Sequence, residues 1–165
     1  MRTLFFRIAA ICLLLPGIAH AGLKEAGEAY DLGNYQIAFQ AFQSLAETGN
    51  GLAQNRLGEL YRDGKGTKKS PKEAATWFEK AAEAGTINAY ANLARMYEEG
   101  LGVEQDRVQA FKWYYLGRTR IENAEALRRL IPKMDPVERA KAKNLARDLG
   151  VRRPSFGSML PALRL

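Results

Sequence analysis

A repeat of 36 residues constrains the fold of this chain more than any other feature of its sequence. When the sequence is shifted by 36 positions, identical small, leucine and aromatic residues coincide: Ala53 with Ala89, Leu57 with Leu93, Tyr61 with Tyr97, Gly64 with Gly100, Gly66 with Gly102, Ala74 with Ala110 and Trp77 with Trp113. A period of about 20–50 residues is typical of solenoids, in which each unit buries its apolar face only by stacking on a neighbour.

The two copies also follow a longer pattern. Residues 51–86 read A-x-x-x-L-G-x-x-Y-x-x-G-x-G and then A-x-x-W-x-x-K-A-A-E-x-G. Residues 87–117 keep most of it, with Ala94 in place of a glycine and a different ending at Tyr115-Leu116-Gly117. This pattern resembles the Sel1-like repeat of the tetratricopeptide-like superfamily. The resemblance implies an all-α, right-handed α-solenoid of antiparallel helix pairs, and an adaptor role in protein–protein interaction.

Further units are expected on both sides of the repeats. Residues 22–50 have the spacing of a shortened N-terminal capping unit, residues 118–150 that of C-terminal capping helices, and residues 151–165 form a basic tail. Residues 70–73 and 135–138 each match a capping box with proline at the first helical position, so helices are expected to begin at Pro71 and Pro136. Asp106 is expected to cap the helix that follows it, and Asn50 the one that starts at 51. Gly58 is expected to allow a partner helix to approach closely.

The first 21 residues have the features of an export signal. Arg2 and Arg7 supply positive charge, residues 8–15 are nearly all apolar, and Ala19-His20-Ala21 is a cleavage site of the A-x-A type. The apolar run is shorter than the roughly 20 residues that a membrane-spanning helix needs. A lipoprotein signal modified at Cys12 is the alternative, but the residue before that cysteine is not small. We therefore expect cleavage after Ala21 and a periplasmic or secreted protein.

Cleavage would remove the only cysteine, Cys12, and the only histidine, His20. A mature chain without thiol or imidazole excludes Ser-His-Asp triads, cysteine nucleophiles and zinc sites with nitrogen or sulfur ligands. We expect no cofactor and no enzymatic activity. The alternative is a protein that binds or hydrolyses peptidoglycan fragments or beta-lactams, as the family resemblance implies for cysteine-rich exported relatives. This chain has neither their disulfide cysteines nor an S-x-x-K motif.

Positive charge is concentrated toward the C-terminus. Residues 22–117 hold 11 basic and 13 acidic residues, a net of −2, whereas residues 118–165 hold 12 basic and 5 acidic residues, a net of +7. A basic end on an exported protein favours an acidic partner or an anionic envelope surface over nucleic acid. The candidate contacts are Arg128, Arg129, Arg152 and Arg153. A solvated terminal helix is the alternative interpretation.

Two other groups of residues are expected to be structural. The recurring aromatics Tyr61, Trp77, Tyr97 and Trp113 stand at core positions of the repeat, which favours interhelical packing over a ligand cage. Residues 65–72 contain four lysines and are expected to form a charged, flexible loop.

The family resemblance places the candidate binding residues on a concave face that the first helix of each unit lines. Asn and Arg can hydrogen-bond a peptide backbone, and Arg can bind a carboxylate in bidentate fashion. The predicted set comprises Lys24, Glu28 and Asp31 from the first unit, Asn55, Glu59 and Arg62 from the second, and Asn88, Asn92, Arg95 and Glu98 from the third. Asn92 with Arg95 is the principal pair. The expected partner is another envelope or periplasmic protein, and an ordinary polar helix face is the alternative.

Overall fold

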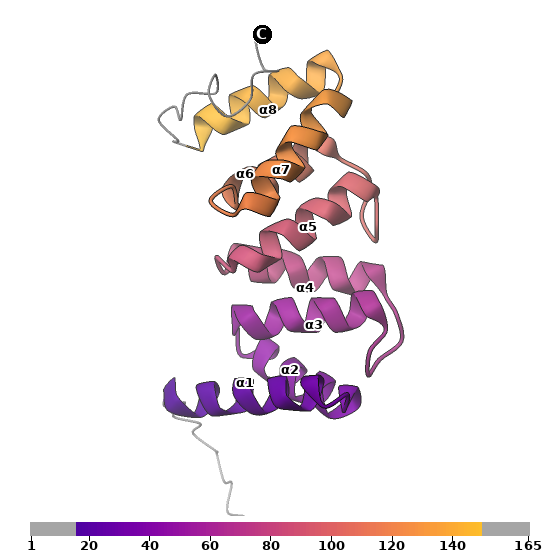
Figure 1. Ribbon diagram of the computed structural model, residues 1–165, viewed down its shortest axis with the longest axis vertical. Helices are drawn as coiled ribbons and strands as arrows, with labels where there is room; N and C mark the ends of the chain where they lie inside the picture. Colours follow the sequence, from indigo (N-terminus) through magenta and orange to yellow (C-terminus); the bar gives the residue numbers. More distant parts are fainter. Residues whose placement is uncertain (1–15, 150–165) are drawn as a thin grey trace, which may run out of the picture.

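The computed structural model describes residues 16–149, which form a stack of helices (Figure 1). In chain order the elements are α1 (Pro16–Asp31), α2 (Tyr35–Glu47), α3 (Gly51–Asp63), α4 (Pro71–Glu83), α5 (Ile87–Glu99), α6 (Arg107–Leu116), α7 (Ile121–Leu130), the short 3-10 helix η1 (Ile131–Lys133) and α8 (Pro136–Asp148). The described residues contain no strand. This confirms the predicted all-α solenoid of antiparallel helix pairs. Most of the expected export signal (1–15) and the basic tail (151–165) lie outside the described residues.

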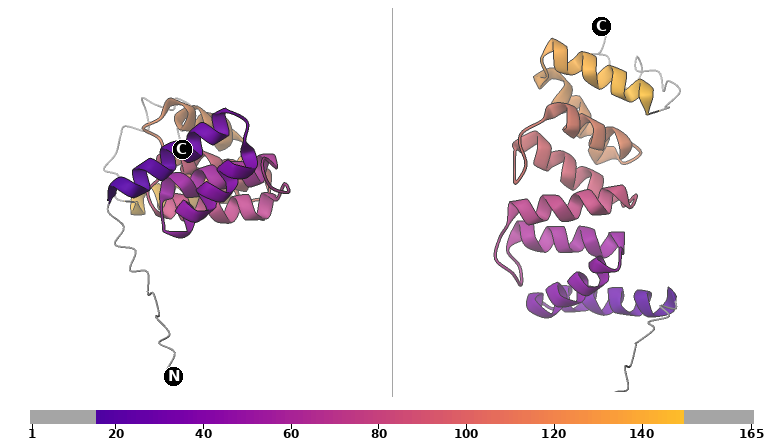
Figure 2. Two further views of the ribbon diagram at one scale, coloured as in Figure 1. Left: turned by 90° about the horizontal axis from the view of Figure 1, so that it is seen from below. Right: turned by 180° about the vertical axis from the view of Figure 1, so that it is seen from behind.

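The helices are arranged along the long axis of the molecule in the order of the sequence. Helix α1 lies at one end of the stack and α8 at the other, and both side views show the same succession (Figures 1 and 2). The first helix of each pair (α1, α3, α5 and α7, called the A helices below) begins at the same edge of the stack, on the left in Figure 1. Their partners α2, α4 and α6 run in the opposite direction.

The predicted cap residues start the helices that follow them. Asn50 accepts a hydrogen bond from the Ala53 amide at 3.0 Å, Ser70 from Glu73 at 3.3 Å, and Asp106 from Val108 and Gln109 at 2.8 and 3.0 Å. Asp135 and Glu138 form a complete capping box. The box at Ser70 is only half formed, because the Ser70 amide donates to the Tyr61 carbonyl at 2.9 Å instead of to the Glu73 carboxylate.

Two kinds of glycine allow the helices and loops to approach closely. A side chain at Gly58 of α3 would collide with the Phe78 ring of α4 at 2.7 Å, which confirms the packing role expected for this glycine. In the long loop between α3 and α4, a Cβ atom at Gly66 would overlap the backbone of Tyr35 at the start of α2. Gly102 has the same relation to Pro71 at the start of α4. The loop of each unit is thus packed against the second helix of the previous unit.

The core forms two clusters along the stack. The N-terminal cluster joins α1, α2 and α3 around Phe42, Leu57 and Leu60. The C-terminal cluster runs from α4 to α8 and includes Phe78, Leu93 and Leu130. The aromatics predicted to pack do so: Trp113 is buried, and Tyr61, Trp77 and Tyr97 are partly buried against the clusters.

The C-terminal end departs from the hairpin pattern. Helices α7 and α8 both pack chiefly against α6, whereas earlier pairs pack mainly against each other. Arg107 at the start of α6 pairs with Glu138 of α8 at 3.6 Å, and Lys133 of η1 pairs with Glu98 of α5 at 3.2 Å. Helix α8 therefore covers the end of the C-terminal cluster. Between residues 16 and 149, no helix has the length and apolar character needed to cross a bilayer.

Candidate partner-binding face

The predicted binding residues belong to α1, α3 and α5, the first three A helices. We call the outward surface of the A helices the A-helix face. The structure divides the predicted residues into two groups. One group is held in contacts between helices, and the other is exposed to solvent.

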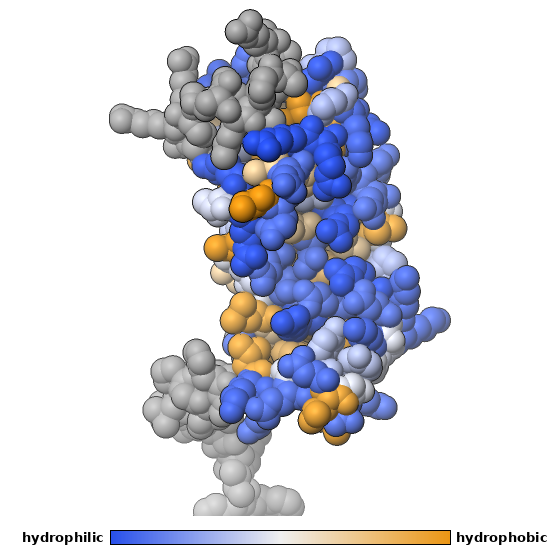
Figure 3. Space-filling view, viewed as in Figure 1, coloured by the Kyte–Doolittle hydropathy of each residue, from blue (hydrophilic) through white to orange (hydrophobic). Residues whose placement is uncertain are grey.

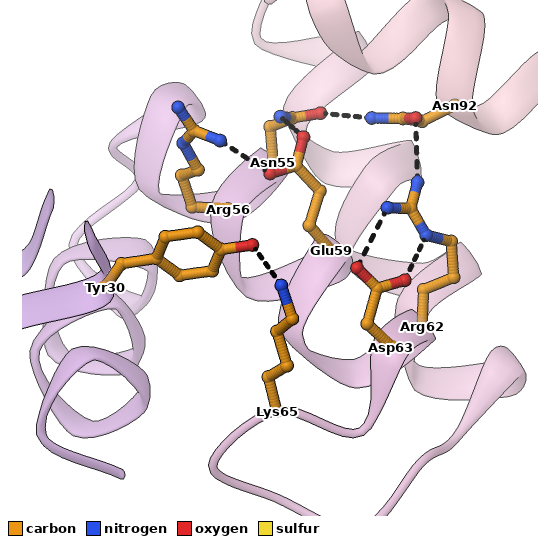
Figure 4. Close-up of polar contacts among 8 residues, drawn as sticks. All are labelled: Tyr30, Asn55, Arg56, Glu59, Arg62, Asp63, Lys65 and Asn92. Atoms are coloured by element: carbon orange, nitrogen blue, oxygen red, sulfur yellow. Dashed lines mark hydrogen bonds and ion pairs between the residues drawn. The ribbon is translucent and has the colours of Figure 1, made fainter. Parts of the chain in front are cut away.

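A chain of hydrogen bonds connects α3 to α5 (Figure 4). The Asn92 side-chain amide of α5 donates to the Asn55 carbonyl oxygen of α3 at 3.0 Å, and the Asn92 carbonyl oxygen accepts from Arg62 Nη1 at 3.2 Å. Asn55 in turn donates to Glu59 Oε1 at 2.9 Å. Each amide is therefore used on both its donor and its acceptor side. We call Asn55, Glu59, Arg62 and Asn92 the inter-repeat network.

The placement of Asn55 corrects the sequence-based prediction. The residue is 3% exposed, so it does not line a groove as expected. A buried amide must be hydrogen-bonded to offset its desolvation, and Asn92 and Glu59 provide these bonds. Asn92 is half-buried and is committed to the same network. Asn92 and Arg95, which were expected to bind a partner together, are therefore separated in role. Asn92 is hydrogen-bonded within the protein, whereas Arg95 is exposed.

Arg62 is compensated within its own helix. Its Nε and Nη2 atoms donate to the two carboxylate oxygens of Asp63 at 2.7 and 3.2 Å. This hydrogen bonding lowers the pKa of Asp63 below its ordinary value, against the opposing effect of burial. Because its donors are shared between Asp63 and Asn92, Arg62 acts as part of the scaffold rather than as a free cation.

Glu98 is also committed to the fold. Its carboxylate accepts from the Tyr114 hydroxyl of α6 at 3.1 Å and from Lys133 at 3.2 Å. Burial, followed by the nearby Glu98 charge and the hydrogen bond to it, raises the pKa of Tyr114 to about 12. Glu98 thus connects α5, α6 and η1.

The remaining predicted residues are exposed. Lys24 and Glu28 form a salt bridge with each other at 3.4 Å on the surface of α1, and Asp31 lies at the end of that helix. Asn88 and Arg95 of α5 are exposed, and their side chains make no hydrogen bond or ion pair with another described residue. They are the predicted groups whose donors are available to a partner.

The sequence interpretation missed a contact between the first two units. Lys65, in the loop after α3, donates to the Tyr30 hydroxyl of α1 at 2.8 Å, and its Nζ atom lies 4.8 Å from the Tyr30 ring centroid. The expectation of a flexible loop is wrong for this part of residues 65–72, because both Lys65 and Gly66 contact the first unit. The only signal in the sequence was a lysine where the next repeat has Leu101.

The structure describes only part of the predicted basic surface. Arg128 and Arg129 are exposed on α7, whereas Arg152 and Arg153 lie outside the described residues. Within residues 16–149, no group of three or more histidine, cysteine, aspartate or glutamate side chains is placed to hold a metal ion. The A-helix face thus presents exposed hydrogen-bond donors and charged groups, and the packed helices beneath hold them in place.

Comparison with known proteins places this architecture in a family. Residues 51–86 and 87–117 match the model of the Sel1 repeat. A protective antigen of uropathogenic Escherichia coli with an SLR fold is 30% identical over 81% of this chain, with a TM-score of 0.75. A Sel1 repeat protein from Oxalobacter formigenes is 30% identical over 78% of this chain, with a TM-score of 0.63.

This chain spans 30% and 56% of the lengths of those two proteins. Cysteine-rich protein B of Helicobacter pylori shares the fold at 21% identity, over 67% of this chain and 95% of its own, with a TM-score of 0.56. Among curated proteins, none matches. The two repeats in register, the helix stack and these structural neighbours together show that the chain belongs to the Sel1-like repeat proteins.

Proposed function

We propose that this protein is an exported, non-enzymatic adaptor that binds a segment of another envelope protein across its A-helix face. Sel1-repeat proteins are generally protein-interaction modules, and the family is typically a non-enzymatic scaffold. Export is supported by the charged, apolar and A-x-A parts of residues 1–21.

The observation that carries the proposal is the inter-repeat network. It holds α3 and α5 in one relative position through Asn55, Asn92 and Arg62. The exposed groups of neighbouring units are therefore presented as a preformed surface. A surface that is ordered before binding loses less conformational entropy when a partner docks. Asn88 and Arg95 are the exposed donors of α5 that such a partner would contact first.

One experiment tests both export and binding. The full chain with a C-terminal tag is expressed in bacteria, cross-linked in intact cells and captured from the periplasmic fraction. We expect a mature N-terminus at Gly22 and a cross-linked partner protein. In an Asn88→Ala/Arg95→Glu variant we expect the partner to be lost. Asn92 is left unchanged because its substitution would disturb the network.

A matched control changes the other side of the stack. Lys72→Glu/Thr76→Ala makes the same change of charge and also removes one polar side chain, on exposed positions of α4. This control is expected to retain the partner. Recovery only from the cytosol with Met1 intact would contradict export. Equal capture by the α5 variant would contradict the A-helix face, and selective loss in Arg128→Glu/Arg129→Glu would place the contact on α7.

A further inference from the structure

Tyr30 of α1 lies close to two positively charged side chains, Lys65 at its hydroxyl end and Arg56 on one side of the ring (Figure 4). The guanidinium carbon of Arg56 is 5.9 Å from the Tyr30 ring centroid, and Lys65 Nζ is 4.8 Å from the same centroid. Lys65 Nζ is also 5.0 Å from the Tyr35 ring, which meets Tyr30 edge-on. We call Tyr30, Arg56 and Lys65 the Tyr30 cluster.

The Lys65 ammonium group is held in place by Tyr30, but no described carboxylate forms an ion pair with it. An ammonium group has three donors, and the hydrogen bond to the Tyr30 hydroxyl uses one. Its other contacts are the faces of two aromatic rings, and it forms no ion pair with a described carboxylate. Nearby Asp63 has both oxygens bound to Arg62.

Arg56 also has capacity left for a ligand. Its Nη1 atom donates to Glu59 Oε2 at 2.9 Å, while its side chain is 53% exposed. Glu59 shares its other oxygen with Asn55 of the inter-repeat network. In this i,i+3 pair only Arg56 is largely exposed, because the Glu59 side chain is 18% exposed. The Arg56 guanidinium is therefore available to a second anion.

Comparison of the two repeats shows that the fold does not need a charge at position 65. The equivalent residue of the next unit is Leu101, and that loop packs against Pro71 through Gly102 in the same way as Gly66 packs against Tyr35. The loop thus keeps its place with an uncharged residue. What Lys65 adds is a fixed cation at the junction of the first two units.

We propose that the Tyr30 cluster binds carboxylate side chains of an acidic partner segment through Lys65 and Arg56. Charge-assisted hydrogen bonds to a carboxylate are about twice as strong as neutral ones, and Tyr30 holds the lysine in position for them. Glu25, Glu28 and Asp31 are exposed on α1, the helix that carries Tyr30, so the two cations lie near negative charge. This favours a flexible acidic segment, whose side chains can reach Lys65 and Arg56 individually, over a flat anionic lipid surface. The inference rests on the proposed adaptor function and specifies that the partner segment is acidic.

A titration with a defined peptide tests the inference. The probe is hexaglutamate with both ends blocked, added to the isotope-labelled full chain, and hexaglutamine is the uncharged control. Amide chemical shifts are expected to change around Tyr30, Arg56 and Lys65 with hexaglutamate only. Lys65→Gln should weaken binding roughly tenfold, because a charge-assisted hydrogen bond is lost. Lys69→Gln, which removes the same charge from the same loop, should leave it unchanged.

Two further variants separate position from charge. Tyr30→Phe keeps every charge but removes the hydroxyl that holds Lys65, and it is expected to weaken binding as well. Lys65→Arg is expected to retain most of it. The spectra themselves report whether each variant is folded.

If Lys65→Gln and Lys69→Gln weakened hexaglutamate binding equally, binding would depend only on the net positive charge of the loop, and the inference would be overturned. Binding to anionic vesicles without binding to hexaglutamate would also overturn it. The peptide titration needs no cellular partner, so its failure is distinguishable from failure of the capture experiment.

Discussion

At the scale of single residues, burial rather than residue type decides what a polar side chain does. Asn55 is buried, Asn92 half-buried and Asn88 exposed, although all three lie on A helices. The 36-residue register pairs Asn92 with Arg56 and gives Asn55 no polar counterpart. Comparison of the repeats therefore could not reveal that Asn55 and Asn92 contact each other. Their bond depends on how α3 and α5 are rotated in the stack.

The raised pKa of the Tyr114 hydroxyl predicts how the stability of the protein changes at alkaline pH. Its pKa in the folded protein is raised from 10.0 to about 12, so folding favours the neutral phenol. The stabilisation is fully present below pH 10.0 and is lost as the pH rises through about 12. Tyr114→Phe is expected to reduce the fall in unfolding free energy over this window. Urea unfolding at several pH values measures it.

An unchanged pH dependence in Tyr114→Phe would contradict the assignment. The ultraviolet absorbance of tyrosinate gives an independent check, because the variant should lack a component that titrates near the upper end of the window. Since Glu98 accepts the Tyr114 bond and also pairs with Lys133, the variant additionally reports on the junction between α5, α6 and η1.

At the scale of elements, the loop glycines join one unit to the next. Gly66 and Gly102 both have positive φ angles and both lie against the backbone that starts a preceding helix. The repeat predicted glycine at these positions, but only the structure shows which backbone they meet. A contact of this kind recurs with the period of the repeat, since Tyr35 and Pro71 are 36 residues apart.

Two glycine substitutions separate backbone strain from packing. Gly85 has a φ of 80° and open space around it, whereas Gly102 has a φ of 74° and lies against Pro71. Gly85→Ala is expected to lower the unfolding free energy by about 1–2 kcal/mol through the left-handed backbone alone. Gly102→Ala should cost a further 1–3 kcal/mol or so, because the loop must move away from α4.

Denaturant unfolding of both variants gives the comparison. The excess cost at Gly102 measures the contact between units. Equal costs at the two positions would show that the loop moves freely and that the contact contributes nothing.

At the scale of the whole molecule, the polar and apolar surfaces are mixed. Figure 3 shows a largely hydrophilic face with scattered apolar side chains rather than one continuous apolar patch. The exposed large apolar residues are spread from Leu32 near one end to Val137 near the other. This distribution suits recognition by hydrogen bonds and charge, which agrees with the proposed role of the A-helix face.

The division of the core into two clusters predicts that the ends of the stack respond separately to mutation. Phe42→Ala, in the N-terminal cluster, is expected to cost about 3–5 kcal/mol. Because each unit of a solenoid contacts only its neighbours, amide hydrogen exchange should accelerate more in α1 and α2 than in α6 and α7. Leu130→Ala, in the C-terminal cluster, should show the reverse pattern. Uniform acceleration along the chain would contradict this division.

The sequence by itself determined the architecture. Helix starts, the long loops and the core aromatics are encoded by residues close together in the chain and are repeated every 36 positions, so one unit supports the interpretation of the next. The predicted caps at Asn50, Asp106 and Asp135 follow from such local chemistry.

Only the tertiary structure decided which polar groups are available to a partner. Asn55–Asn92 and Tyr30–Lys65 join residues 37 and 35 positions apart, on different helices or on a helix and a loop. A hydrogen bond forms or fails over a fraction of an ångström, whereas a hydrophobic pattern tolerates larger shifts. The rotation and spacing of packed helices therefore committed Asn55 and Asn92 to the scaffold and left Asn88 and Arg95 exposed.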